Sequence, residues 1–271
     1  MLSKFDSKKH HQFSRNLPFS YLSLPLYLDF CAYTFKRNGE DLIVWQDILY
    51  PNDFPSIFLP QKKENWEKST IALVTPEQID ALEKEGVKIN LQNFIDTEYF
   101  YKTDNFIHPK GKIKERVAQF ERLYLYKVSY EYQKDKIINF YNQWHDQKER
   151  ADSALFYQES DELFHFCLNN LKKYKIRQIY IEINGKLAGL AWGAEHSSKN
   201  WVGLHMKTDY LYKGLSRFLQ KKRAELFEDF ENFSLGTSCH EDGLKTFKKE
   251  LNPLYTKDYY YLSTGEKNGK T

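Results

Sequence analysis

The sequence predicts an α+β protein of two similar units, each with a mixed, largely antiparallel sheet flanked by helices. The main observation is Asn184-Gly185 between two β-prone runs, because a type I′ hairpin turn needs positive φ at both central residues. Strand and helix patterns then alternate as far as Tyr261. The first half carries a similar Asn-Gly hairpin signal at Asn38-Gly39, followed by strand and helix. Two copies of one αβ unit are consistent with this repeat.

The length of 271 residues also fits two domains, since domains typically hold about 100–200 residues. We place the boundary near residue 125, which gives an N-terminal domain of residues 1–125 and a C-terminal domain of residues 126–271. A basic amphipathic helix is predicted over Pro109–Tyr124, with Val117 and Phe120 on its apolar side. This helix would bridge the two halves.

The first half contains short strands and one well-marked helix. Strand patterns occur within residues 27–60 and again over Ile71–Val74. Thr75 then occupies an N-cap position, a proline follows it, and Gln78 completes a capping box. Gly86 is placed to end this helix.

The N-terminal region contains an apolar run, Leu17–Phe35, that could be mistaken for a membrane segment. It is interrupted by Pro18, Pro25 and Asp29, whereas a spanning helix needs about 20 mostly apolar residues. We therefore expect no transmembrane segment here but a buried loop followed by a strand. A peripheral membrane contact remains an alternative. Residues 1–16 are polar and basic, so we expect a frayed arm.

The second half alternates strands and helices. A strand is predicted over Leu123–Glu131 and a helix over Asp135–Gln147, and Ser160 is placed to cap another helix over Asp161–Lys173. The hairpin strands, a third strand and a basic helix follow, then a strand, a short helix and an aromatic strand. An antiparallel meander followed by strand, helix, strand, helix and strand is the order of an acyltransferase core. Such a core joins an activated acyl group to an amine.

The composition excludes several classes of protein. The chain has 40 basic and 37 acidic residues, so a general nucleic-acid coat is not expected, although a local basic face is. Cys31, Cys167 and Cys239 are odd in number and far apart, which argues against disulfides and fits a reducing cytoplasm. No clustered Cys/His pair indicates zinc, so we expect no metal site.

A first cluster of candidate residues lies where a strand ends and the basic helix begins. His205 is a candidate proton acceptor, with a hydrogen-bonded structural histidine as the alternative reading. Lys207 and Tyr210 are candidate substrate-binding residues, and Asp209 is a candidate catalytic carboxylate. Gly214 stands alone in a loop that needs two or three small residues to cradle a pyrophosphate. We therefore expect no cofactor, and acetyl-CoA is the alternative.

The basic helix itself carries a row of cations. Lys213, Arg217 and Lys221 recur every four residues on one face. One reading is a solvated outer face. The other is an electrostatic contact to an RNA acceptor stem or to an anionic lipid, for which Lys213 and Arg217 are candidate binding residues.

A second cluster precedes and enters the short helix. Glu241 and Asp242 either cap this helix or bind substrate. Lys245 and Lys248 are one turn apart, so both could face one cleft and stabilise the oxyanion of an acyl transfer. A thiol mechanism at Cys239 is not expected, because the adjacent histidine in the sequence does not bring the two side chains together.

Three motifs resemble one family: Gly111–Phe120, His205–Gly214 and Glu241–Pro253. They are similar to motifs in the C-terminal domain of bacterial phosphatidylglycerol lysyltransferases. That family has tandem GNAT-type folds and is related to the Fem aminoacyltransferases. The resemblance covers more than half of the chain, and its motifs are moderately specific.

The resemblance implies transfer of an aminoacyl group from aminoacyl-tRNA, without metal, to an amine or hydroxyl of a lipid head group, a peptide or a small molecule. It places Lys207, Asp209, Lys245 and Lys248 at positions carried over from the family. Lys245 departs from the usual arginine, which weakens bidentate anion binding. Lys222 stands where an acid is expected.

Three functions are therefore open. An aminoacyltransferase that uses aminoacyl-tRNA comes first, and an N-acetyltransferase that uses acyl-CoA is the runner-up. A non-catalytic binding module on the same fold is the third, and the lysine at position 222 permits it.

Overall fold

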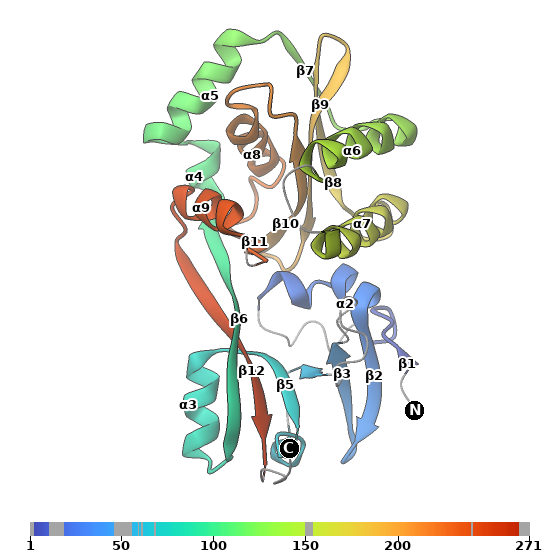
Figure 1. Ribbon diagram of the computed structural model, residues 1–271, viewed down its shortest axis with the longest axis vertical. Coiled ribbons are helices and arrows are strands. Elements are labelled where there is room, and N and C mark those ends of the chain that lie inside the picture. The colour runs from blue at the N-terminus through green and yellow to red at the C-terminus, as the bar shows by residue number, and fades with distance from the viewer. Residues whose placement is uncertain are drawn as a thin grey trace. The chain divides into compact units, whose positions relative to one another are not determined.

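Both Asn-Gly signals form hairpin turns in the computed structural model, which describes residues 3–10, 19–45, 56–58, 60, 62–67, 69–149, 154–239 and 241–265. Asn38 and Gly39 have φ of 49° and 72°, and Asn184 and Gly185 have φ of 52° and 73°. Positive φ at both positions is what a type I′ turn requires. The protein is α+β, with mixed, largely antiparallel pairing of strands and helices beside them (Figure 1).

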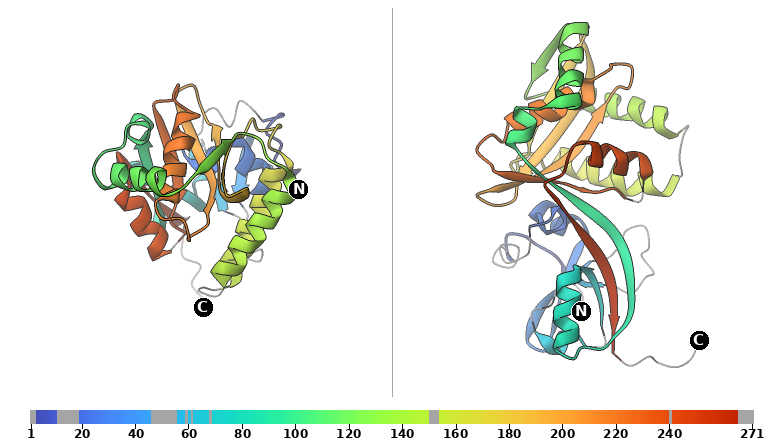
Figure 2. Two further views of the ribbon diagram at one scale, coloured as in Figure 1. Left: turned by 90° about the horizontal axis from the view of Figure 1, so that it is seen from above. Right: turned by 90° about the vertical axis from the view of Figure 1, so that its left-hand side faces the viewer.

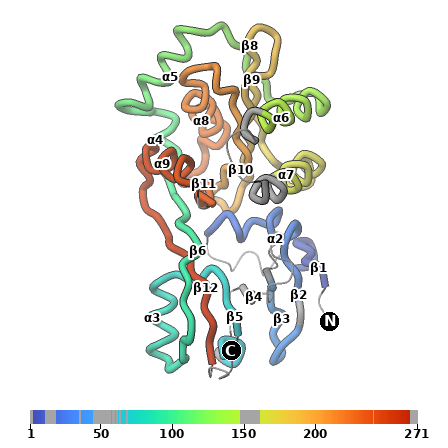
Figure 3. Tube along the Cα trace, viewed as in Figure 1, coloured from blue at the N-terminus to red at the C-terminus, as the bar shows by residue number. Residues whose placement is uncertain are grey.

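The chain divides into two compact units. Unit 1 holds residues 1–99, 237–248 and 255–271, and unit 2 holds residues 100–236 and 249–254. The tube in Figure 3 follows the chain from unit 1 along β6 (Ile89–Lys102) and back along β12 (Tyr255–Thr264). These two long strands are neighbours in the sheet and run side by side (Figure 2).

Unit 1 is built on one run of paired strands. Their order is β1-β2-β3-β4-β5-β12-β6. The pairing of β4 with β5 is parallel, and the pairs β1–β2, β2–β3, β3–β4 and β5–β12 are antiparallel. The strands not yet bounded are β1 (Ser3–Lys4), β2 (Ala32–Arg37), β3 (Glu40–Trp45), β4 (Ser56–Phe58) and β5 (Thr70–Val74). The helices are η1 (Tyr21–Ser23), α2 (Pro25–Cys31), η2 (Lys63–Asn65) and α3 (Pro76–Lys84).

Unit 2 continues from β6 with the strand order β11-β10-β9-β8-β7. Its strands are β7 (Tyr126–Ser129), β8 (Arg177–Ile183), β9 (Lys186–Glu195), β10 (Asn200–Thr208) and β11 (Asn232–Thr237). β10 pairs with β11 in parallel and with β9 antiparallel. The helices that follow β6 are α4 (Asp104–Ile107), α5 (Gly111–Leu123), α6 (Lys134–Glu149), α7 (Ala154–Asn169), α8 (Leu215–Glu225) and α9 (Asp242–Glu250), whose last residues lie in unit 2.

Two helix layers cover the sheet of unit 2 (Figure 1). On one face, α5 and α8 pack through Phe120 and Phe218, whose ring centroids are 4.6 Å apart. This face buries Ile179, Ile181 and Ile183 of β8 in the same cluster. On the other face Phe164 of α7 stacks on Trp192 of β9, with the centroids 4.9 Å apart. The alternation along β8 and β9 therefore places every second side chain in each layer.

Several expectations differ from the structure. Residues 25–31 form helix α2 rather than a loop, because Pro25 occupies the first helical turn and Leu26, Leu28 and Cys31 are buried at helical spacing. Ser3–Lys4 forms a strand with β2 instead of fraying. Residues 1–2 and 11–18 lie outside the described part of the chain.

Helix α7 begins at Ala154, so Ser160 lies inside it instead of capping it. It ends at Asn169, which leaves Lys172 and Lys173 in the turns that follow. Strand β6 was not anticipated, since its exposed half carries a polar pattern without turn signals.

The division between units also differs from the predicted boundary near residue 125. It falls within β6, after Tyr99, and helix α5 belongs to unit 2 because Phe120 packs on Phe218. Residues 237–248 and 255–265 return to unit 1. None of the helices in the described part of the chain combines the length and hydrophobicity that a membrane crossing needs.

Candidate functional site

Strand β10 leaves its parallel neighbour part-way along its length. Its pairing with β11 covers Asn200–Val202, opposite Asn232–Ser234. Its pairing with β9 continues to Thr208, with a register shift between Gly203 and Met206. A bulge of this kind bends a strand and re-aims its side chains, and it is common beside active sites. The second half of β10 is therefore a candidate functional site in unit 2.

The bulge is filled by a buried arginine that sequence reasoning missed. Arg223 of α8 is 1% exposed, and its guanidinium donates to the carbonyls of Trp192 at 3.2 Å and Leu204 at 3.4 Å. Gly203 permits this approach, because a Cβ there would lie 3.0 Å from the guanidinium carbon. Burial lowers the pKa of Arg223 to about 9. The sequence could have indicated this burial, because Leu215, Leu219 and Arg223 recur every four residues and so share one face of a helix.

Two donors in this cluster have no partner within the described residues. They are Nε of Arg223 and Nε2 of Gln220. Gln220 is 1% exposed, and its Oε1 accepts a hydrogen bond from Arg223. The cluster therefore holds more donors than acceptors.

His205 lies on the opposite face of β10, among aromatic rings. Its ring centroid is 5.3 Å from that of Phe164 and 5.8 Å from that of Trp192. Burial, together with the charge of Lys207, lowers the pKa of His205 to about 3, against a hydrogen bond to the Leu163 carbonyl that acts to raise it. The imidazole is therefore neutral at physiological pH. This geometry fits the structural reading of His205 better than the proton-acceptor reading.

The other candidates at this strand end point in different directions. The Lys207 ammonium lies 3.8 Å from the ring centroid of Trp144 in α6, a cation–π contact. The Asp209 carboxylate accepts a hydrogen bond from the backbone N–H of Leu211 at 2.9 Å, which shapes the turn. Tyr210 is 62% exposed. The structure thus brings Lys207 beside His205 and leaves Asp209 and Tyr210 in the loop.

The loop before α8 is closed against α5. Gly214 has φ of 86°, and a Cβ there would lie 2.3 Å from the carbonyl oxygen of Arg116. The Lys213 amide donates to the hydroxyl of Tyr124 at 3.3 Å, and the Leu215 amide donates to the carbonyl of Tyr212 at 3.2 Å. A phosphate cradle needs such amides to face a ligand, and here these two are bonded within the protein.

Of the predicted row of cations, Lys213 lies before α8, and the two that lie on the helix are neutralised. Arg217 donates to Glu250 at 2.8 Å, and burial lowers the pKa of Arg217 while Glu250 acts to raise it. Lys221 forms an ion pair with Glu225. Only Lys213 of the three keeps an exposed side chain in the described structure.

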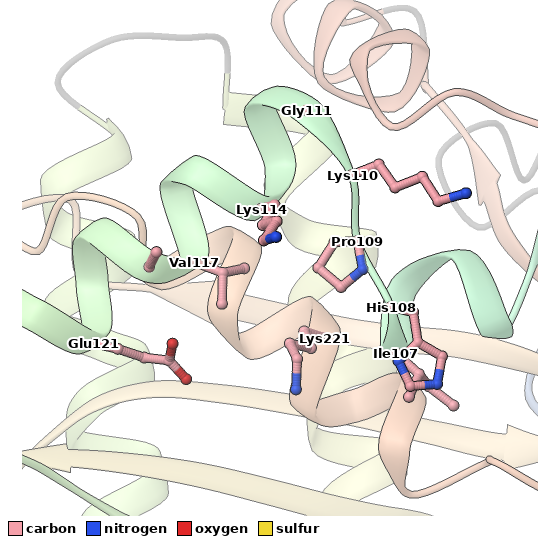
Figure 4. Close-up of a pocket in the computed structure, with 10 residues that line it drawn as sticks. Ile107, His108, Pro109, Lys110, Gly111, Lys114, Val117, Glu121 and Lys221 are labelled. Carbon is pink, nitrogen blue, oxygen red and sulfur yellow. The ribbon is translucent and has the colours of Figure 1, made fainter.

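A basic pocket lies beside Lys221, between α8 and the α4–α5 corner. Its volume is about 640 Å³. Figure 4 shows Lys114 and Glu121 on α5 and Lys221 on the facing helix α8. The pocket is lined by four basic side chains and one acid, which are His108, Lys110, Lys114, Lys221 and Glu121. The sequence feature that could have indicated this pocket is the run of alternating lysines at positions 110, 112 and 114.

The second predicted cluster lies in unit 1, on α9. Lys248 is 4% exposed, its ammonium donates to the carbonyl of Thr237, and it lies 5.9 Å from the ring centroid of Tyr99. The Tyr99 hydroxyl is buried and has no hydrogen-bond partner within the described residues. Lys245 is exposed. The two lysines that were expected to share a cleft therefore have different surroundings.

The acids of this cluster sit at the start of the helix. Asp242 is its first residue and is exposed, which suits the positive end of the helix dipole. The carbonyl of Glu241 accepts the amide of Lys245 at 2.9 Å. Residue 240 lies outside the described part of the chain. Among the described side chains, no group of three or more His, Cys, Asp or Glu could hold a metal ion.

Comparison of the fold finds similar solved structures. A conserved protein of unknown function from Bacteroides thetaiotaomicron superposes with a TM-score of 0.78 at 12% identity, over 97% of this chain and 99% of that one. The structure of L-PGS from Bacillus licheniformis gives 0.60 at 11% identity, over 96% and 92%. FemX gives 0.60 at 9% identity, over 96% of both chains.

The fold is GNAT-like. The similarity to L-PGS and FemX confirms, at the level of fold, the resemblance that the sequence motifs indicated. No protein-family model and no curated protein sequence matches this chain. At 9% to 12% identity these solved structures show the fold of this protein, and a shared fold does not identify the reaction.

Proposed function

We propose that this protein is an aminoacyltransferase that takes its acyl group from aminoacyl-tRNA. The acceptor in this proposal is an amine or a hydroxyl on a lipid head group, a peptide or a small molecule. The observation that carries the proposal is the basic pocket of α5 and α8, beside a helix start where the amides of Lys213 and Leu215 are already bonded.

The pocket favours a polynucleotide donor. Coenzyme A would need free amides at the start of α8 to hold its pyrophosphate. The amides of Lys213 and Leu215 instead bond Tyr124 and Tyr212, and the α5 backbone lies against Gly214. Lysines around an open pocket suit a chain of phosphodiesters, since each lysine that meets a phosphate neutralises it and releases counterions. No cofactor is part of the proposal, and acetyl-CoA is its alternative.

The chemistry is transfer of an ester-bound aminoacyl group. The acceptor nitrogen or oxygen attacks the ester carbonyl, and a tetrahedral oxyanion forms. The bond to the ribose oxygen then breaks, and that oxygen takes up the proton lost by the acceptor and leaves as a hydroxyl. A fixed cation stabilises such an oxyanion more strongly in a buried site than in water. Our candidate for this cation is Lys248 of unit 1, whose side chain is buried and whose ammonium donates to the carbonyl of Thr237.

The test compares donors directly. We expect aminoacyl-tRNA to bind with an affinity that falls as salt rises. Replacing both Lys110 and Lys114 with glutamine should weaken binding. The slope of log K against log salt should also become shallower, by about one for each phosphate that the variant no longer neutralises. The matched control removes two exposed charges outside the pocket, Lys112→Gln and Lys172→Gln.

Thermal shift decides between the donors. A saturating ligand at a hundredfold excess over its Kd should raise the free energy of unfolding by about 2.7 kcal/mol. Stabilisation by acetyl-CoA, with none by charged tRNA, would reverse the order of the two candidates. Binding of tRNA without transfer of labelled amino acid to lipid, peptide or amine acceptors would identify a binding module.

A further inference from the structure

The two most exposed large hydrophobic side chains in the described part of the chain are both leucines of unit 2. Leu125 is 91% exposed and Leu211 is 78% exposed. Each has an exposed neighbour, Leu123 at 51% and Tyr210 at 62%. Leu125 lies on the loop between α5 and β7, just after Leu123 ends α5, and Tyr210 and Leu211 lie on the loop between β10 and α8. Exposed leucines on loops are costly in water. A group of them at one place therefore indicates a surface that is covered by a binding partner or a membrane.

The two loops are held against each other. The amide of Lys213 donates to the hydroxyl of Tyr124 at 3.3 Å. The rings of Tyr124 and Tyr212 meet edge to face, with centroids 5.2 Å apart. We call residues 122–127 and 209–213 the docking loops. The tip of the β8–β9 hairpin lies beside them, because Tyr126 pairs with Ile183 and the amide of Asp209 donates to Ala188.

The surroundings of these leucines are cationic. The exposed basic side chains on the docking loops and the hairpin tip are Arg122, Lys127, Lys186 and Lys213. Lys127 lies 3.7 Å from Glu182, yet its side chain is 74% exposed. The Asp209 carboxylate, the one acid on the second docking loop, accepts a hydrogen bond from the amide of Leu211. Leucines and a tyrosine with a cationic rim have the chemistry of a bilayer interface, where apolar side chains enter and cations meet anionic head groups.

We propose that the docking loops seat the protein on the surface of an anionic lipid bilayer. Leu125 and Leu211 enter the interface, Tyr210 lies at the level of the head groups, and the four cations contact lipid phosphates. The binding is reversible, since a few apolar side chains and charges give only weak anchoring. A second copy of this chain is disfavoured as the occupant, because a twofold interface would set the same cations against each other.

Vesicle binding tests this proposal. We expect the protein to co-sediment with phosphatidylcholine vesicles that contain about one third phosphatidylglycerol, and much less with phosphatidylcholine alone. The double variant Leu125→Ser with Leu211→Ser should lower the partition coefficient by at least about tenfold. Replacing Lys213 and Arg122 with glutamine should lower it by about fivefold for each charge.

Matched controls separate the docking loops from general surface effects. Leu254→Ser removes a leucine that is 49% exposed elsewhere in unit 2. The pair Lys172→Gln and Lys249→Gln removes two exposed charges that lie outside the docking loops. Both controls should leave vesicle binding within about twofold of the unmodified protein. Circular dichroism checks the fold of each variant, and if the leucine variant does not fold, the charge variant decides.

Three results would overturn the proposal. The first is no binding of the unmodified protein to the anionic vesicles. The second is binding that the leucine and charge variants leave unchanged. The third is a dimer, seen by sedimentation, that the leucine variant converts to a monomer without any vesicle binding. Phosphatidylglycerol carries hydroxyls of the kind that the transferase proposal gives to the acceptor. The docking-loop variants leave the basic pocket and Lys248 unchanged, so loss of vesicle binding in them reports on the docking loops and can be told apart from failure of the transferase proposal.

Discussion

The guanidinium of Arg223 donates to the carbonyl of Leu204, inside the bulged stretch of β10. This bond ties α8 to the strand just beyond the residues that pair with β11. A bulge leaves ladder groups without strand partners, and a buried carbonyl without a donor is costly. Arg223 supplies donors to Leu204 and to Trp192 at once, so the position of the strand end depends on this side chain.

We expect Arg223→Met to lower the free energy of unfolding by about 2 kcal/mol. Two carbonyls lose their donor at about 1–3 kcal/mol each, and removing a desolvated charge offsets part of that loss. Urea unfolding measures the difference. The control is Arg116→Met on the exposed side of α5, which should stay within about 0.5 kcal/mol. A variant as stable as the unmodified protein would show that the buried cation contributes nothing net.

Gly214 is expected to tolerate no side chain. Gly214→Ala places a methyl group 2.3 Å from the Arg116 carbonyl oxygen and also strains a φ of 86°. Gly185→Ala is the matched control, because its φ of 73° carries the same strain with no atom within 4 Å. The control should cost about 1 kcal/mol. We expect Gly214→Ala to cost at least about 2 kcal/mol more, measured by thermal or urea unfolding. Equal losses would mean that α5 can move away from α8.

The elements that could be predicted from the sequence are those whose turns or ends are marked by particular residues. The Asn-Gly turns fix two hairpins, and the Thr75–Gln78 capping box begins α3 as expected. These features depend on residues a few positions apart, which a sequence shows directly. Strand β6 depends instead on neighbours far along the chain, namely β12 and β11. The residue pattern of β6 does not identify it as a strand, because pairing with distant strands, and not local propensity, makes it one.

For the candidate site, too, the sequence predicted what depends on neighbouring residues and missed what depends on distant ones. Helical spacing correctly placed Lys245 and Lys248 one turn apart, and both lie within α9. Spacing could not show that one is buried against Thr237 while the other is exposed. Arg223 was not singled out from the sequence, because only the packed bulge shows that a guanidinium fits there. Contacts between distant residues decide burial, and burial decides which cations can act.

His205 should make stability depend on pH. Its pKa is about 3 in the folded protein, against an ordinary value of 6.5 in the unfolded chain. Above pH 6.5 both states hold a neutral ring, and between pH 6.5 and 3 the unfolded state binds the extra proton, so stability falls as the pH falls. From pH 7.5 to pH 5 we expect this group alone to remove about 2 kcal/mol.

The variant His205→Phe isolates this effect. Phenylalanine keeps a ring between Phe164 and Trp192 and does not titrate. The difference in unfolding free energy between pH 7.5 and pH 5 should therefore be about 2 kcal/mol smaller in the variant. An identical pH dependence in both proteins would mean that the ring is already solvated and charged in the folded state.

Lys248 is expected to affect both stability and catalysis. Its side chain is 4% exposed, and its ammonium donates to the Thr237 carbonyl. Lys248→Met keeps most of the stem, removes the charge and leaves that carbonyl without this donor, at a cost of about 1–3 kcal/mol. If the ammonium also stabilises the oxyanion, kcat should fall by roughly 10²–10³ in the folded fraction. Lys249 is exposed, so Lys249→Met should change neither quantity appreciably.

The two effects are separated by measuring them on the same samples. Unfolding curves give the fraction folded at the assay temperature, and single-turnover rates with aminoacyl-tRNA are divided by that fraction. A catalytic role predicts a large fall in the corrected rate, because the missing charge acts only as the oxyanion develops. A rate that stays normal after correction, with stability lowered, would make Lys248 a buried structural lysine. In that case the oxyanion would have to be stabilised by another group.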